Sequence, residues 1–108
     1  MAEVGTSRDY RLAQDFIERH GGAWVSKRDG LVVVRVRAGA ETWLLWFRST
    51  PITERALRLF DRVRRRYRHD RALVVRAGEV ADYVAFRDIE DLGIELATLE
   101  EVEERLGG

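Results

Sequence analysis

A row of arginines in the middle of the sequence has the spacing expected of a surface that contacts phosphates. These side chains fall on one flank of a helix predicted over residues 52–67, outside its apolar stripe. They are Arg55, Arg58, Arg62, Arg65 and Arg66, and charge is added near the helix end by Arg64, Arg68 and Arg71. Phosphate contacts release counterions, so binding through this flank would weaken as salt rises. The alternative is a solvated face, in which the Glu54–Arg58 and Asp61–Arg65 pairs use part of the charge.

Two further positions carry charge beside apolar segments. Asp29 directly precedes the segment GLVVVRV, and Arg48 ends the segment 42–48. Aspartate before glycine in a turn is favoured for backbone reasons alone, so Asp29 is either a turn residue or a metal ligand. Arg48 is either a solvated residue at a strand end or a phosphate contact. Trp43 and Trp46 fit packing against a sheet better than base stacking.

The composition removes several classes of chemistry. The sequence has no cysteine, which excludes disulfides, thiolate zinc sites and cysteine nucleophiles. Only two histidines are present, so no histidine-rich metal site is expected, and His20 and His69 are interpreted as surface or helix-end residues. No apolar run is long enough to span a membrane, and the first nine residues lack the apolar core of a secretion signal. We therefore expect a cytoplasmic protein without membrane contact.

The length and the polar composition add two expectations. A chain of 108 residues fits one domain with one core, over residues 1–108. Asparagine is absent, and Lys27 is the single lysine among 19 basic residues. Abundant charge with few thermolabile amides is typical of thermophile proteins, although a GC-rich genome also enriches arginine over lysine.

The net charge is zero but unevenly distributed along the chain. Residues 52–78 carry nine basic and three acidic side chains, whereas residues 79–108 carry two basic and ten acidic ones. This separation indicates a partner surface, or a contact between the basic and the acidic regions.

Apolar patterning and turn residues predict an α/β domain. Strands are predicted at residues 23–27, 31–37, 42–48, 71–76 and 94–96. Helices are predicted from Ser7 to His20, over 52–67, over 80–92, and after a Thr98–Glu101 capping box. The first three strands form an antiparallel meander, and two strand–helix–strand passages add parallel strands by crossover. Because 42–48 is apolar on both faces, it lies inside a mixed central sheet that is flanked by helices.

The predicted helix over 52–67 is specified in most detail. Thr50 is its predicted cap and Pro51 its first residue. Its core-facing stripe is predicted to consist of Ile52, Ala56, Leu59, Phe60, Val63 and Tyr67.

This order of elements resembles the restriction-endonuclease-like fold, the family of Mrr-like restriction enzymes and archaeal Holliday-junction resolvases. The most similar stretch is 71–106, RALVVRAGEVADYVAFRDIEDLGIELATLEEVEERL. Its plan of apolar strand, helix, short GIEL strand and acidic helix is similar to the end of Mrr-like domains. The resemblance covers nearly the whole chain and is one of pattern.

The resemblance implies a PD-(D/E)xK site. In that family an Asp opens the second strand, and an acid and a Lys two residues apart on the third strand point to one side. The acids hold a divalent metal that activates water. By this pattern Asp29 matches the first acid and Arg48 takes the Lys position, while Trp46 takes the acid position. Tryptophan cannot bind magnesium, and arginine stays protonated, so the motif is degenerate.

Three functions are compatible with these residues. The first is a nuclease-fold domain or non-catalytic subunit that binds nucleic acid without cutting it and needs no cofactor. The second is a structural or assembly subunit that binds protein, or another copy of itself, through the basic helix and the acidic tail. The third is an active Mg²⁺-dependent nuclease with a rearranged site, in which a carboxylate joins Asp29. The candidates for that carboxylate are Asp9, Asp15, Glu18 and Glu41.

Overall fold

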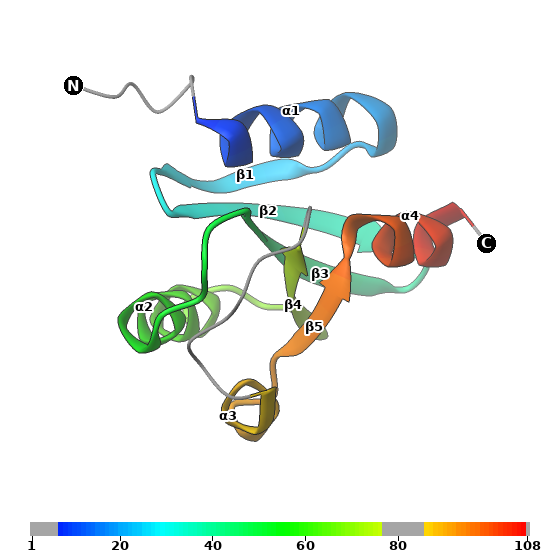
Figure 1. Cartoon of the computed structure of the whole chain (residues 1–108). Coiled ribbons are helices and arrows are strands. Elements are labelled where there is room, and N and C mark those ends of the chain that lie inside the picture. The colour runs from blue at the N-terminus through cyan, green and yellow to red at the C-terminus, as the bar shows by residue number, and fades with distance from the viewer. Residues whose placement is uncertain (1–6, 77–85, 108) are drawn as a thin grey trace.

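The computed structural model describes residues 7–76 and 86–107, which form a five-stranded sheet with helices on both faces (Figure 1). The strands are β1 (Ala23–Arg28), β2 (Leu31–Ala38), β3 (Glu41–Arg48), β4 (Arg71–Arg76) and β5 (Glu95–Thr98). The helices are α1 (Arg8–His20), α2 (Glu54–Arg64), α3 (Phe86–Asp91) and α4 (Leu99–Gly107). None of the helices in the described ranges is long and apolar enough to cross a membrane.

The strand order in the sheet, β1-β2-β3-β4-β5, is the order of the strands in the chain. β1, β2 and β3 pair antiparallel, whereas β4 and β5 are added in parallel. The α/β class, the mixed sheet and the interior position of β3 are therefore confirmed.

Helices cover the two faces of the sheet in pairs. Leu44 and Trp46 of β3 point to the face where α2 and α3 pack. Leu45 and Phe47 alternate with them and face α1 and α4. All four side chains are buried, as the apolar character of both faces of this strand predicts.

The first helix and the turn of the first hairpin lie at the predicted residues, and the two strands of the hairpin each end one residue later than predicted, at Arg28 and Ala38. The Ser7 side chain caps α1 by accepting a hydrogen bond from the Tyr10 amide at 3.1 Å. After α1 the chain turns at Gly21, whose φ of 81° suits glycine. Asp29 and Gly30 form the turn between β1 and β2, where Gly30 has a φ of 80°.

Helix α2 starts later and ends earlier than predicted. Thr53, not Thr50, is the cap, because its hydroxyl accepts a hydrogen bond from the Ala56 amide at 3.1 Å. Pro51 lies before the helix, where its carbonyl accepts hydrogen bonds from the Arg48 side chain. The predictions of Thr50 as cap and Pro51 as first helical residue are therefore wrong.

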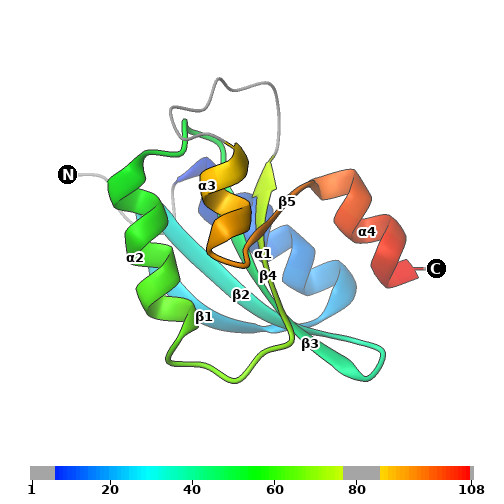
Figure 2. The ribbon, with the colours of Figure 1, turned by 90° about the horizontal axis from the view of Figure 1, so that it is seen from below.

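The buried stripe of α2 is also rotated from the predicted one. The helical spacing predicts that Leu59 faces the core, but it is 38% exposed, whereas Leu57 is 3% exposed. The predicted core residue Tyr67 is 37% exposed because the helix ends before it. The rotation places Leu57 in the core that it shares with Ile89 of α3 and with Ile94, which follows α3, because α3 packs beside α2 on the same face (Figure 2). The other predicted contacts are confirmed, since Ile52, Ala56, Phe60 and Val63 all pack there.

The C-terminal elements follow the predicted order, but β5 spans Glu95–Thr98 instead of the predicted 94–96. Of the helix predicted over 80–92, residues 80–85 lie outside the described ranges, and the described part is α3. The capping box before α4 is confirmed, because the Thr98 and Glu101 amides each donate to the other residue's side chain at 3.1 Å. The hydrogen bond from the Thr98 amide, followed by one from the Thr98 side chain, lowers the pKa of the Glu101 carboxyl.

Candidate nucleic-acid interface

Trp46 and Arg48 of β3, which the sequence resemblance placed at the acid and Lys positions, donate to one backbone oxygen. The Trp46 indole Nε1 donates a hydrogen bond to the Gly30 carbonyl at 3.0 Å, and Arg48 Nη1 donates to the same oxygen at 2.9 Å. The rest of the guanidinium donates to the Pro51 carbonyl, from Nε at 3.1 Å and from Nη2 at 2.8 Å. We call these two side chains the Trp46–Arg48 pair. They attach the β1–β2 turn to the segment that leads into α2.

Packing holds the Trp46–Arg48 pair in place. The Trp46 side chain is 0% exposed and stacks on Phe60 of α2 with the ring centroids 4.9 Å apart. The Arg48 guanidinium carbon lies 5.4 Å from the centroid of the Trp46 ring, within the range of a cation–π contact. Trp46 is therefore a packing residue, and the Arg48 guanidinium forms hydrogen bonds with backbone carbonyls.

Asp29 is exposed in the β1–β2 turn and lines a small cavity of about 170 Å³. Arg28, Arg48, Arg55 and Leu59 are among its other lining residues, and Asp29 is the single carboxylate among those described. No group of three or more histidine, aspartate or glutamate side chains suited to a metal ion occurs in the part of the chain that the structure describes.

The carboxylates proposed as partners of Asp29 have other contacts. Asp9 is buried, and its Oδ1 accepts a hydrogen bond from the Ser49 amide at 2.8 Å, at the same end of β3 as Asp29. Asp15 pairs with Arg19 at 3.0 Å. Glu41 lies at the opposite end of β3, and Glu18 is exposed on α1. The fold thus brings only Asp9 to that end of the sheet.

Sequence reasoning missed Arg76 as part of this region. The residue is 8% exposed, and its Nη1 donates to the carbonyls of Arg48 at 2.7 Å and of Thr50 at 2.9 Å. It supports the same loop as the Trp46–Arg48 pair from the neighbouring strand. A charged residue directly after the apolar run 72–75 of an interior strand is the signal that could have identified it.

The exposed flank of α2 carries three arginines, Arg55, Arg58 and Arg62, and Arg65 caps the end of the helix beside them. Two have an acidic partner, since Arg58 pairs with Glu54 at 3.4 Å and Arg65 with Asp61 at 3.1 Å. Arg55 and Arg62 form no ion pair with any described residue. Arg66 lies after the end of the helix rather than on it.

A shallow hollow of about 570 Å³ lies along this flank. Arg55, Arg58 and Arg62 line it together with Leu59. Glu54, the ion-pair partner of Arg58, lines it as well. The surface thus offers the exposed leucine beside Arg55 and Arg62, which have no ion-pair partner among the described residues.

Other arginines near α2 have structural contacts instead. Arg64 is nearly buried, pairs with Asp61 at 2.8 Å and donates to the Leu92 carbonyl, so it joins α2 to the end of α3. Arg71 pairs with Glu41 and with Glu95, both at 3.3 Å. The predicted charge near the helix end is therefore reduced to Arg66 and Arg68.

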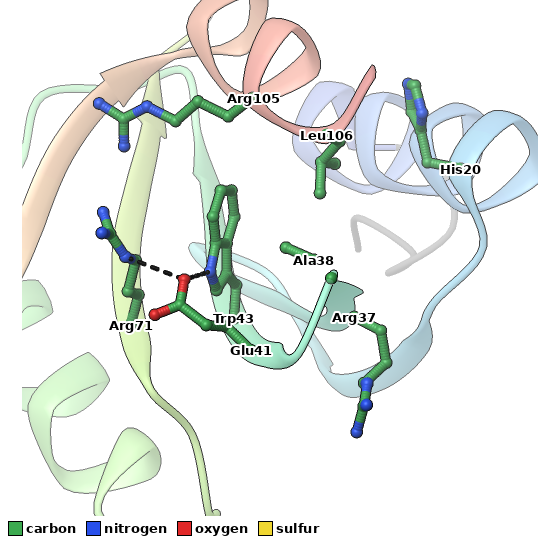
Figure 3. Close-up of a pocket in the computed structure, with 9 residues that line it drawn as sticks. His20, Arg37, Ala38, Glu41, Trp43, Arg71, Arg105 and Leu106 are labelled. Carbon is green, nitrogen blue, oxygen red and sulfur yellow. Dashed lines mark hydrogen bonds and ion pairs between the residues drawn. The ribbon is translucent and has the colours of Figure 1, made fainter. Parts of the chain in front are cut away.

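A second open cavity, of about 680 Å³, lies between the β2–β3 hairpin and α4 (Figure 3). Charges are largely paired there. Figure 3 shows Glu41 between Arg71 and the Trp43 indole, whose Nε1 donates to it at 3.1 Å. His20 lies at the end of α1, and its Nε2 is 2.8 Å from Glu103. This hydrogen bond, together with Arg19, lowers the pKa of the Glu103 carboxyl.

No family model, curated protein or solved structure matches the chain. A mixed sheet with helices on both faces occurs in proteins of many activities. Function must therefore be inferred from the exposed side chains and their surroundings.

Proposed function

We propose that this protein is a nucleic-acid-binding domain of restriction-endonuclease-like fold that does not cut its ligand on its own. The observation that carries the proposal is the exposed flank of α2. Arg55 and Arg62 stand there without an acidic partner in the described chain, one on each side of Leu59. Unpaired guanidinium groups on an open surface suit the phosphates of a nucleic-acid backbone.

The arrangement of strands supports the fold assignment. A three-strand antiparallel meander followed by two parallel strands is the order that the resemblance implies. The third strand carries the Trp46–Arg48 pair at the positions of the acid and the Lys. Because both side chains donate to the Gly30 carbonyl, they favour a structural role at the nuclease-like positions.

Salt dependence tests the binding surface directly. In the variant Arg55→Ala/Arg62→Ala, the slope of log affinity against log salt should flatten by about two, because each arginine that no longer touches a phosphate lowers it by roughly one unit. Affinity should fall alike for every sequence, because phosphate contacts do not read bases. Fluorescence anisotropy with single-stranded, duplex and branched oligonucleotides at several salt concentrations measures both effects.

A matched control is available on the other face of the sheet. Arg8 and Arg11 are exposed on α1, so Arg8→Ala/Arg11→Ala removes the same charge from another surface. This control should leave the slope nearly unchanged. Equal effects of the two double variants would contradict a specific role for α2, and absence of binding by the unmodified protein at low salt would remove the proposal.

A second candidate function is an assembly subunit, and one observation favours it. Helix α2, which carries the basic flank, and the acidic helix α4 pack on opposite faces of the sheet. A contact between them therefore has to join two copies of the chain. Under this function, Arg55→Ala/Arg62→Ala changes the oligomeric state at low salt and leaves the affinity for nucleic acid unchanged.

The purified protein is expected not to cleave nucleic acid with Mg²⁺ or Mn²⁺. Asp29 is the single carboxylate described at its cavity, and the neighbouring Arg48 is bound to backbone carbonyls. Incubation of labelled oligonucleotides with each metal, followed by gel electrophoresis, measures this. Metal-dependent cleavage that disappears in Asp29→Ala would show the third function, an active nuclease, to be correct.

A further inference from the structure

Two arginines of β2 lie on the face of the sheet where α2 packs. Arg35 pairs in register with Leu44, a buried residue of that face, and Arg37 pairs with Thr42 at the end of the hairpin. Both arginine side chains are exposed. Figure 3 shows Arg37 pointing away from the paired charges of Glu41 and Arg71.

A third arginine reaches the same place through the loop after α2. The Asp70 amide donates to the Thr42 carbonyl at 2.7 Å, and the Thr42 amide donates back to Asp70 Oδ2 at 2.7 Å. These two hydrogen bonds attach the loop to the start of β3. Arg68, two residues earlier, thereby lies beside Arg35 and Arg37. In Figure 2 this loop runs along the end of the sheet from which the β2–β3 hairpin projects.

The three arginines surround an open hollow of about 490 Å³. His20, Gly22 and Ala23 also line it, and none of the described lining residues is aspartate or glutamate. Gly22 has a φ of 134°, and a Cβ there would lie 3.0 Å from the Arg35 carbonyl oxygen. The α1–β1 connection thus packs its backbone directly against β2 at the wall of the hollow.

The nearest described carboxylates have other partners. Asp70 accepts a hydrogen bond from the Thr42 amide, and Glu41 pairs with Arg71. Glu103 pairs with His20 and Arg19. Arg35, Arg37 and Arg68 themselves form no ion pair with any residue in the described ranges. Three arginines without a described ion-pair partner therefore line one hollow, and no described aspartate or glutamate lines it with them.

We propose that the hollow formed by Arg35, Arg37 and Arg68 is a binding site for a phosphate group. Guanidinium groups donate paired hydrogen bonds that match phosphate oxygens, and three of them supply the charge that a phosphate dianion needs. The phosphate belongs either to a nucleic-acid strand that continues past the end of α2 or to a free phosphate compound. The strand source rests on the function proposed above, whereas the site itself does not.

Titration with inorganic pyrophosphate tests the site without nucleic acid. Calorimetry should show saturable binding by the unmodified protein and about tenfold or greater weakening in Arg35→Gln/Arg68→Gln, which loses charge-assisted hydrogen bonds. Both residues are exposed, so the variant should unfold at the same urea concentration as the parent. The variant Arg8→Gln/Arg11→Gln serves as the matched control and should bind pyrophosphate normally.

An oligonucleotide titration of the same variants identifies the source of the phosphate. If the strand supplies it, Arg35→Gln/Arg68→Gln flattens the salt slope by about two and pyrophosphate competes with the oligonucleotide. If a free compound supplies it, pyrophosphate binding weakens while the oligonucleotide slope stays unchanged. Absence of saturable pyrophosphate binding, or equal weakening in the α1 control, overturns the site. Failure of Arg55→Ala/Arg62→Ala to alter oligonucleotide binding would instead reject the function of α2 and leave pyrophosphate binding intact.

Discussion

Replacing Trp46 with glutamate is expected to unfold the protein rather than create a metal ligand. The side chain is 0% exposed and stacks on Phe60. Losing a buried tryptophan costs about 3–5 kcal/mol, and a buried carboxylate without a partner adds a further desolvation penalty. The free energy of unfolding of a domain of this size is about 5–15 kcal/mol. The two losses together are therefore comparable to the whole stability of the protein. Urea unfolding followed by circular dichroism measures the loss.

The variant Trp46→Phe separates packing from hydrogen bonding. It keeps an aromatic ring against Phe60 but removes the Nε1 donor to the Gly30 carbonyl. That oxygen still accepts from Arg48, so the expected loss is about 1–2 kcal/mol. A Trp46→Glu protein that stays folded and binds Mg²⁺ would contradict the structural role assigned to the Trp46–Arg48 pair.

Two leucines of α2 provide a second test with a large expected effect. Leu57 is 3% exposed and packs in the core shared with α3, so Leu57→Ala should reduce the free energy of unfolding by about 2–5 kcal/mol. Leu59 is 38% exposed, and Leu59→Ala should change it by less than about 1 kcal/mol. The two variants remove the same atoms from the same helix, so each is the control of the other.

Chemical denaturation of the two variants shows which side of α2 faces the core. A larger loss in Leu59→Ala than in Leu57→Ala would mean that the helix faces the sheet as the sequence stripe predicts. It would also remove Leu59 from the exposed flank, where it accompanies the arginines of the proposed interface.

The strands were predictable because their signals are local. The turn at Asp29 and Gly30 and the alternation of apolar residues set the meander, and the doubly apolar segment 42–48 identified the interior strand. The orientation of α2 was not predictable in this way. It depends on α3, a neighbour distant in the chain, whose Ile89 packs in the same core as Leu57.

The candidate site shows a similar division. The pattern placed Arg48 and Trp46 on one side of a strand whose end lies near Asp29, and the structure agrees. The partners of Arg48 were hidden because they are backbone carbonyls, which every residue has and which no sequence pattern marks. Helical spacing predicted which arginines lie on the exposed flank of α2. It did not predict that the side chain of Arg64 is nearly buried.

The order of strands in the sheet has a consequence for the electrostatic field of the molecule. Because the strands follow one another in space as they do in sequence, the uneven charge of the chain becomes a lateral polarity. Basic side chains gather towards β1, β2 and α2, and acidic ones towards β5, α3 and α4. We therefore expect a dipole across the sheet in a protein whose formal net charge is zero. The field of a polyanion would orient such a molecule before contact. The association rate would therefore fall as ionic strength rises, although the net charge is zero.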